Sequence, residues 1–300
     1  MAFAKPYLMD AILSMAAFHL RSSVPDDKSL VQASYFYSTS SLVAYCASLE
    51  SGITPDSAEA LSMTAVLIAF QAIASRLFIR DDLGSNPDNY PTHYTPPISW
   101  FYYFQGVQTV VAASWLWIRD SANVKAVIAD PVFQLDLYPQ ASNSFFSYLL
   151  EDLEEELSTE DPLLAKVTAQ AYLHAVRVIG WAHQEIDAAA TLSFLTTVSS
   201  RFVELVEAKR PRALVIFASF FALLKRMDAW WLRDIARREV MGLVGIFPSG
   251  SKWWQCLEWA VRIALWDGDI IPQDIWSAGG NKESLAQGVF FLQHVGLIDN

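Results

Sequence analysis

An almost uninterrupted run of twelve apolar residues, Ala213 to Leu224, constrains the fold of this chain more than any other feature. Crossing the hydrocarbon core of a membrane takes about 20 residues, so the run is too short to span one. A helix that is apolar on every side but too short for a membrane is typical of the centre of a large core. We therefore expect residues 211–227 to form a central helix that amphipathic neighbours surround.

The spacing of apolar residues along the rest of the chain favours helices throughout. Apolar side chains recur every three or four residues, and signals for strands are scarce. No Gly/Pro-rich linker divides the chain, and no internal repeat is evident. The sequence therefore predicts an all-α fold, with residues 1–300 as a single large multi-helix domain.

Local signals place the first three helices. Pro6 suits a first helical position, Asp26 or Asp27 can cap a second helix that ends near Leu49, and Thr54 can cap a third. In the first helix we expect one buried face. Its residues are Leu8, Ile12, Met15 and His19. After the central helix, we expect a further helix that carries Trp230 and Trp231, with Asp228 as its cap or as a partner of Arg233.

Charge and cysteine content exclude several classes of protein. The net charge of −11 repels phosphate backbones, so we expect no direct nucleic-acid binding by this chain. Two cysteines, Cys46 and Cys256, are too few for a disulfide framework or a cysteine zinc cluster, which favours an intracellular protein. The apolar N-terminal run is interrupted by Asp10, so we interpret it as a core helix and expect neither a signal peptide nor a membrane span.

Catalytic and metal-binding signatures are largely missing from the sequence. There is no glycine-rich phosphate loop and no helical histidine pair, and Asp81 and Asp82 are adjacent, so they would point apart on a helix. We expect no cofactor and no metal. His183 and Asp187 are spaced for an acid/base pair on one helix face, although an exposed histidine at a helix end is the simpler interpretation. The acidic run from 151 to 161 has the composition of a solvated helix face.

A proline-rich segment, residues 80–99, is long for a loop within a compact domain. It holds Pro87, Pro91, Pro96 and Pro97. Loops of this length often cover a functional site, so the segment is a candidate lid, with a plain surface excursion as the alternative.

The C-terminal third resembles a known family. The stretch from Lys209 to Pro248, followed by "WWQCLEWAVRIAL", is similar to the C-terminal regulatory domain of fungal binuclear zinc-cluster transcription factors of the sterol-uptake regulator kind. The residues that carry the resemblance are Pro211, Ala213, Leu214, Trp230, Trp231, Leu232, Arg233, Pro248, Trp254, Glu258 and Trp259. The segment "LMDAILSMAAFHL" and the region around Tyr35 are also similar, whereas Ala260 stands where the family usually has proline. The resemblance implies an all-helical domain that binds a small hydrophobic molecule and controls a separate DNA-binding module.

Three functions are compatible with these observations. The first is a ligand-sensing regulatory domain in the nucleus, and the second is a cytoplasmic enzyme on the same scaffold that cyclises or isomerises a hydrophobic natural product of secondary metabolism. The third is an interaction scaffold without a small ligand, in which exposed aromatic residues meet a partner or a second copy of the chain, as in a homodimer. Aromatic walls with a few polar groups would suit an apolar ligand or substrate. The candidate lining residues are Trp100, Tyr103, His183, Phe221, Asp228 and Trp231.

Overall fold

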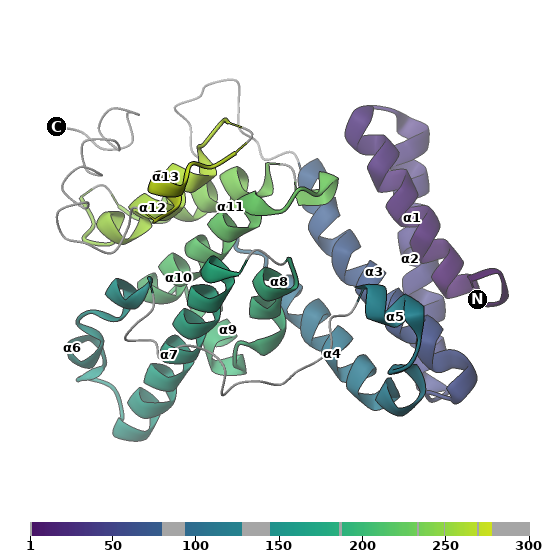
Figure 1. The fold of residues 1–300 in the computed structure, drawn as a ribbon, viewed down its shortest axis with the longest axis horizontal. Helices are drawn as coiled ribbons and strands as arrows, with labels where there is room; N and C mark the ends of the chain where they lie inside the picture. Colours follow the sequence, from purple (N-terminus) through teal and green to yellow (C-terminus); the bar gives the residue numbers. More distant parts are fainter. Residues whose placement is uncertain are drawn as a thin grey trace. The chain divides into compact units, whose positions relative to one another are not determined.

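A computed structural model describes residues 2–79, 94–127, 145–185, 188–232, 234–248, 250–268 and 270–277 (Figure 1). Every regular element within these ranges is a helix, which confirms the all-α prediction. By their contacts the residues group into two compact units. Unit 1 comprises Met1–Ile79, Ser99–Phe133 and Ala229–Arg233, and unit 2 comprises the remaining segments. The single-domain organisation stays a prediction, and most of the candidate lid lies outside the described residues.

Unit 1 contains the N-terminal helices. Its elements are η1 (Ala2–Ala4), α1 (Pro6–Ser23), α2 (Lys28–Glu50), α3 (Pro55–Ser75), η2 (Arg76–Phe78), α4 (Ser99–Ile118), α5 (Ala122–Val127) and η7 (Trp230–Leu232). The local signals in the sequence set the helix starts: Pro6 begins α1, the Asp27 side chain accepts hydrogen bonds from two amides of α2, and Thr54 forms a capping box with Ser57. Gly52, with φ of 91°, forms the left-handed turn between α2 and α3.

The buried face of α1 differs from the expected one. Leu8 is buried, but Ile12 is 43% exposed and His19 is exposed as well. The face that packs inward instead carries Ala11, Ser14 and Ala17, together with larger residues at each end. Small side chains leave room for a neighbouring helix, and on this face Ser14 Oγ donates to the Ser34 carbonyl oxygen of α2 at 3.2 Å.

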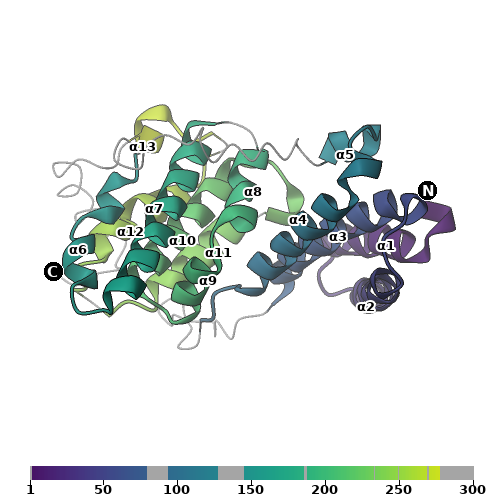
Figure 2. The same ribbon diagram turned by 90° about the horizontal axis from the view of Figure 1, so that it is seen from below.

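Unit 2 is built around the apolar helix. Its elements are η5 (Ser147–Leu150), α6 (Leu153–Leu157), α7 (Pro162–Gln184), α8 (Ala188–Thr197), α9 (Ser200–Glu207), α10 (Pro211–Leu223), η6 (Leu224–Arg226), α11 (Ile235–Val244), α12 (Trp254–Ala264) and α13 (Gln273–Ser277). Helix α10 contacts α7, α8, α9, α11 and α12, and Figures 1 and 2 show it among them. Every residue from Arg212 to Leu224 is buried, so the prediction of a central helix is confirmed.

The segment after α10 is not the expected helix. Trp230 and Trp231 lie in the short 3₁₀ helix η7, and α11 begins only at Ile235. Asp234 precedes α11 in the left-handed conformation, with φ of 60°, which interrupts a continuous helix between the tryptophans and Ile235. Asp228 is exposed, and its proposed partner Arg233 lies outside the described residues.

The acidic run is only partly a solvated face. Glu156 forms an ion pair of 2.8 Å with Arg212, and Glu160 forms one of 2.7 Å with Arg210. Arg212 is 3% exposed and also donates to the carbonyl oxygens of Leu149 and Glu151. These contacts attach α6 and the preceding turn to the start of α10, a role that charge composition alone does not reveal.

Among the described residues, one helix, Pro55–Phe78, is long and apolar enough to cross a membrane by length and composition. Half of its most apolar window is buried inside the structure. A helix that is buried inside a helical unit has the same apolar composition.

Candidate functional site

The six candidate lining residues divide between the two units. Unit 1 holds Trp100, Tyr103 and Trp231, and unit 2 holds His183, Phe221 and Asp228. Trp100 is fully buried in α4, Tyr103 is 39% exposed, and the Trp231 ring stacks on Phe70 at a centroid distance of 4.8 Å.

In unit 2, Phe221 is fully buried against Phe217, with ring centroids 4.3 Å apart. Asp228 is exposed. His183 differs from both, because aromatic rings surround its imidazole. Its surroundings combine aromatic walls with directed hydrogen bonds.

The His183 imidazole lies between two parallel rings at the end of α7. The Phe145 ring stacks on it at 4.3 Å and 12°, and the Trp276 indole stacks on it at 4.8 Å and 3°. Phe146 and Trp259 contact the same imidazole edge-on, at 5.5 Å and 5.7 Å. We call these five residues the His183 cluster. Offset and edge-to-face ring contacts of this kind each stabilise by about 0.5–1.5 kcal/mol beyond the area they bury.

Hydrogen bonds fix the orientation of the rings. His183 Nε2 lies 3.2 Å from the Trp276 carbonyl oxygen, and the Trp259 indole N–H donates to that same oxygen at 3.0 Å. A carbonyl can only accept, so Nε2 carries the proton and Nδ1 is the unprotonated nitrogen. In return, the Trp276 indole N–H donates to the His183 carbonyl oxygen at 3.3 Å.

Arg226, which follows α10 in η6, completes the arrangement. Its Nη1 donates to the His183 carbonyl oxygen at 3.3 Å, and its guanidinium carbon lies 4.5 Å from the centre of the Trp276 ring. The Trp276 side chain therefore joins the short helix α13 to α7, η6 and α12. Burial lowers the pKa of the His183 imidazole to about 4, and the nearby Arg226 charge acts in the same direction, so the ring is neutral at pH 7.

The sequence pattern identified His183 but not its partners. Asp187, the expected acid/base partner, lies outside the described residues, and His183 is only 9% exposed, so the alternative of an exposed helix-end histidine is wrong. Trp259 lies in the stretch that resembles the zinc-cluster family, so this resemblance could have identified it as a candidate lining residue. Phe145 and Trp276 carry no local signal, because each contact depends on a distant segment folding back onto α7.

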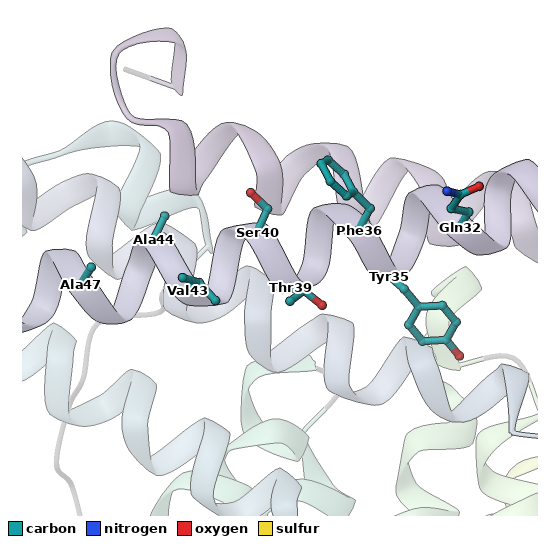
Figure 3. A pocket seen from close by; sticks show the side chains of 8 residues that line it. All are labelled: Gln32, Tyr35, Phe36, Thr39, Ser40, Val43, Ala44 and Ala47. Carbon is teal, nitrogen blue, oxygen red and sulfur yellow. The ribbon is translucent and has the colours of Figure 1, made fainter.

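A second feature is a shallow groove of about 740 Å³ along α2 in unit 1 (Figure 3). All of its lining residues come from this one helix: Gln32, Tyr35, Phe36, Thr39, Ser40, Val43, Ala44 and Ala47. None of the six candidate residues lines it.

Near the groove, the Arg21 guanidinium stacks on Tyr35 and Phe78, at 5.5 Å and 4.1 Å from the ring centres. In the part of the chain that the structure describes, no group of three or more His, Cys, Asp or Glu side chains could hold a metal ion.

Two curated proteins are similar to this chain. A Zn(2)-C6 fungal-type transcription factor of Gibberella zeae is 60% identical over 281 residues, which cover 92% of this chain and 57% of the relative. The chain is a homologue of Zn(2)-C6 fungal-type transcription factors. The Zn(2)-C6 fungal-type transcription factor afumD of Aspergillus fumigatus is 24% identical over 220 residues, 72% of this chain and 56% of that protein.

These relatives confirm the resemblance seen in the sequence. The chain spans little more than half the length of each of them. No protein-family model matches the chain, and no solved structure does. Both relatives are described as transcription factors, so the alternative of a stand-alone enzyme gains no support from them.

Proposed function

We propose that this chain is the regulatory part of a nuclear transcription factor, which receives a chemical signal and controls a separate DNA-binding module. The observation that carries the proposal is the 60% identity with a Zn(2)-C6 transcription factor over 281 residues. The 300 residues contain two cysteines, and their net charge is −11, so DNA contact through a cysteine zinc cluster falls outside this sequence.

The signal we propose is a small, flat, apolar molecule, and the His183 cluster is its binding site. Phe145 and His183 form a stacked surface whose outer side is covered by the Trp276 indole. Trp276 is the buried residue of α13, a helix of five residues. A flat ligand that displaced this indole would gain the same stacking surface.

The hydrogen bonds of the cluster define the polar group that such a ligand needs. Displacing Trp276 would remove its carbonyl oxygen from two donors, His183 Nε2 and Trp259 Nε1. Leaving two buried donors unpaired costs about 1–3 kcal/mol each. The ligand therefore carries a carbonyl or hydroxyl oxygen that accepts from both, and a purely hydrocarbon molecule binds poorly.

Native mass spectrometry tests this proposal. The chain is incubated with a hydrophobic metabolite extract, and its mass is compared with that of a denatured control. We expect a retained small molecule that is released unchanged. Trp259→Phe, which removes one donor, should weaken retention at least about tenfold, whereas Trp276→Leu, which removes the competing indole, should strengthen it. Trp117→Phe on α4, where the native side chain is 47% exposed, is the control.

A reporter assay tests the regulatory role separately. The chain is fused to an unrelated DNA-binding domain, and transcription is measured with and without the extract. Ligand-dependent transcription in the wild-type fusion, with a shifted dose response in Trp259→Phe, is the expected result. Absence of both a retained molecule and a transcriptional response would refute the sensor. If the chain instead converts a metabolite over many turnovers, the enzyme hypothesis replaces the sensor hypothesis.

A further inference from the structure

Arg21, in the last turn of α1, carries a buried positive charge. The residue is 7% exposed, and its Nε and Nη1 atoms are buried without a hydrogen-bond partner in the described structure. Buried charges in proteins are normally paired, because an unpaired ion away from water is costly. The described residues therefore do not supply the anion that the burial of Arg21 requires.

Two aromatic rings flank the guanidinium, but neither replaces an anion. The guanidinium carbon lies 4.1 Å from the centre of the Phe78 ring and 5.5 Å from that of the Tyr35 ring. A ring attracts a cation through its face, whereas the N–H groups of a guanidinium point outward in its own plane. The rings thus hold the guanidinium in position and leave its N–H donors for an oxyanion.

The two aromatic walls differ in how they are held. Phe78 stacks on the buried Phe18, with ring centroids 5.8 Å apart, so it forms the inner wall. Tyr35 is 53% exposed and forms the outer wall. A ligand can therefore reach the guanidinium from solvent by turning one exposed tyrosine side chain, without opening the hydrophobic core.

The charge of the site favours a carboxylate over a phosphate. A carboxylate brings one negative charge and accepts two parallel hydrogen bonds from a guanidinium. A phosphate monoester brings about −1.5 to −2 charges, and further cations or free backbone amides are needed to match it. From Ser29 to Leu49, α2 contains no charged residue, and the amides of a helix interior bond within the helix. One guanidinium balances one carboxylate, so the site suits a monocarboxylate.

Tyr35 also connects this site to the groove along α2. The groove residues that follow it at four-residue spacing are Thr39, Val43 and Ala47, and together they form a row about 18 Å long. Figure 3 shows Tyr35 and Val43 on the same side of the helix. Val43 is 65% exposed, so this row offers an apolar surface to a hydrocarbon chain.

The other side of the groove carries a negative charge. Ser40 Oγ donates to the Asp10 carboxylate at 2.7 Å. This carboxylate repels a second acidic group and holds water more readily than hydrocarbon. A bound ligand therefore has its single carboxylate at Arg21 and its chain along the row that Tyr35 begins.

We infer that Arg21 is the anion-binding end of a second ligand site, which takes a monocarboxylate with an unbranched apolar chain. The carboxylate pairs with the Arg21 guanidinium between the Phe78 and Tyr35 rings, and the chain lies on α2. Every residue of this site belongs to unit 1, and none belongs to the His183 cluster. The inference therefore holds or fails separately from the proposed function.

Isothermal titration calorimetry of the full chain with decanoate tests the inference. We expect saturable binding of a single decanoate to each chain. Decanol keeps the chain but lacks the charge, and acetate keeps the carboxylate but lacks the chain, so each should bind at least about tenfold more weakly. Decyl phosphate, which carries extra negative charge, should also bind more weakly than decanoate.

Two pairs of variants test the two halves of the site. Arg21→Gln, which removes the charge, should weaken decanoate binding at least about tenfold, whereas Arg119→Gln, at an exposed arginine of the same unit, should leave it unchanged. Val43→Glu, which places a negative charge beside the chain, should also weaken it at least about tenfold. Leu42→Glu, at a residue of the same helix that is 41% exposed and outside the groove, is its control.

A wild-type chain that does not bind decanoate overturns the inference, and this arm needs no variant to fold. So does equal affinity for decanol or decyl phosphate, or full decanoate affinity in an Arg21→Gln variant that circular dichroism shows to be folded. Trp259→Phe alters the His183 cluster and should leave decanoate binding unchanged. Loss of binding in Trp259→Phe would assign decanoate to that cluster and would also overturn the inference.

Discussion

His183 and Trp276 bind each other twice, through their rings and through their backbones. The two rings lie parallel, with centroids 4.8 Å apart and an angle of 3° between their planes. His183 Nε2 lies 3.2 Å from the Trp276 carbonyl oxygen, and the Trp276 indole N–H donates to the His183 carbonyl oxygen at 3.3 Å. One side chain on α13 thus satisfies the carbonyl at the end of α7, which has no partner within its own helix. This reciprocal pair fixes the neutral tautomer of His183.

Replacing Trp276 should release α13. Trp276 is 5% exposed, and truncating a buried tryptophan costs about 3–5 kcal/mol. We expect Trp276→Ala to lower the stability of unit 2 by that amount in urea denaturation, with a loss of hydrogen-exchange protection around residues 273–277. Trp117→Ala, on the exposed side of α4, should cost less than about 1 kcal/mol. Equal effects of the two substitutions would mean that the ring contacts contribute little.

The stability of the chain should fall as pH decreases from about 6.5 to about 4. Burial lowers the pKa of His183 to about 4, whereas the unfolded ring titrates near 6.5, so between these values the unfolded chain binds the extra proton. The stabilisation is complete above pH 6.5, and about 3 kcal/mol is lost on reaching pH 4. His183→Gln should flatten this part of the wild-type profile of unfolding free energy against pH.

A second histidine provides an internal comparison. Burial also lowers the pKa of His174, whose Nε2 lies 3.0 Å from the Thr197 carbonyl oxygen, so its contribution has the same sign. His174→Gln should therefore remove a smaller part of the slope. If both variants retain the full wild-type slope, carboxylates rather than histidines control this pH range.

Gly242 in α11 should not tolerate a methyl group. A Cβ at this position would overlap the ring of Tyr94, whose hydroxyl donates to the buried Glu239 carboxylate at 2.5 Å. We expect Gly242→Ala to destabilise by about 1–3 kcal/mol, despite the better helix propensity of alanine, because the tyrosine must move. Gly106→Ala in α4, where a Cβ meets nothing within 4 Å, should instead stabilise by up to about 1 kcal/mol. Thermal unfolding of the two variants makes the comparison.

Arg212 should be indispensable for holding α6 and the turn before it. Arg212→Ala removes the nearer of the two arginines that pair with Glu156, leaving Arg210 at 3.6 Å, and it deprives two backbone carbonyls of their donor. Removing one partner of a buried ion pair costs about 3–5 kcal/mol. Arg119→Ala, which removes an exposed ion pair with Asp120, should change stability by less than about 1 kcal/mol. Denaturant midpoints at equal protein concentration measure both effects, and a small change for Arg212→Ala would contradict the assigned role.

Much of the fold was predictable because helix starts depend on local chemistry. Asp27 accepts hydrogen bonds from amides two and three residues away, and Thr54 and Ser57 cap each other. Such signals lie within one turn of sequence. By contrast, the face of α1 that packs inward was mispredicted, because it carries the small residues Ala11, Ser14 and Ala17, which a search for large apolar side chains passes over.

The sequence by itself determined an all-helical chain, the central position of α10 and the resemblance to zinc-cluster transcription factors, because composition, periodicity and motifs are all properties of short stretches. Only the tertiary structure decided which side chains surround His183. In the chain, the acidic helix α6 and most of α7 separate Phe145 from His183. Trp276 lies 93 residues after His183. A periodic pattern of apolar residues predicts that a given residue is buried. The partner it meets depends on how distant segments pack, since ring stacking and carbonyl hydrogen bonds form only after the chain has folded back on itself.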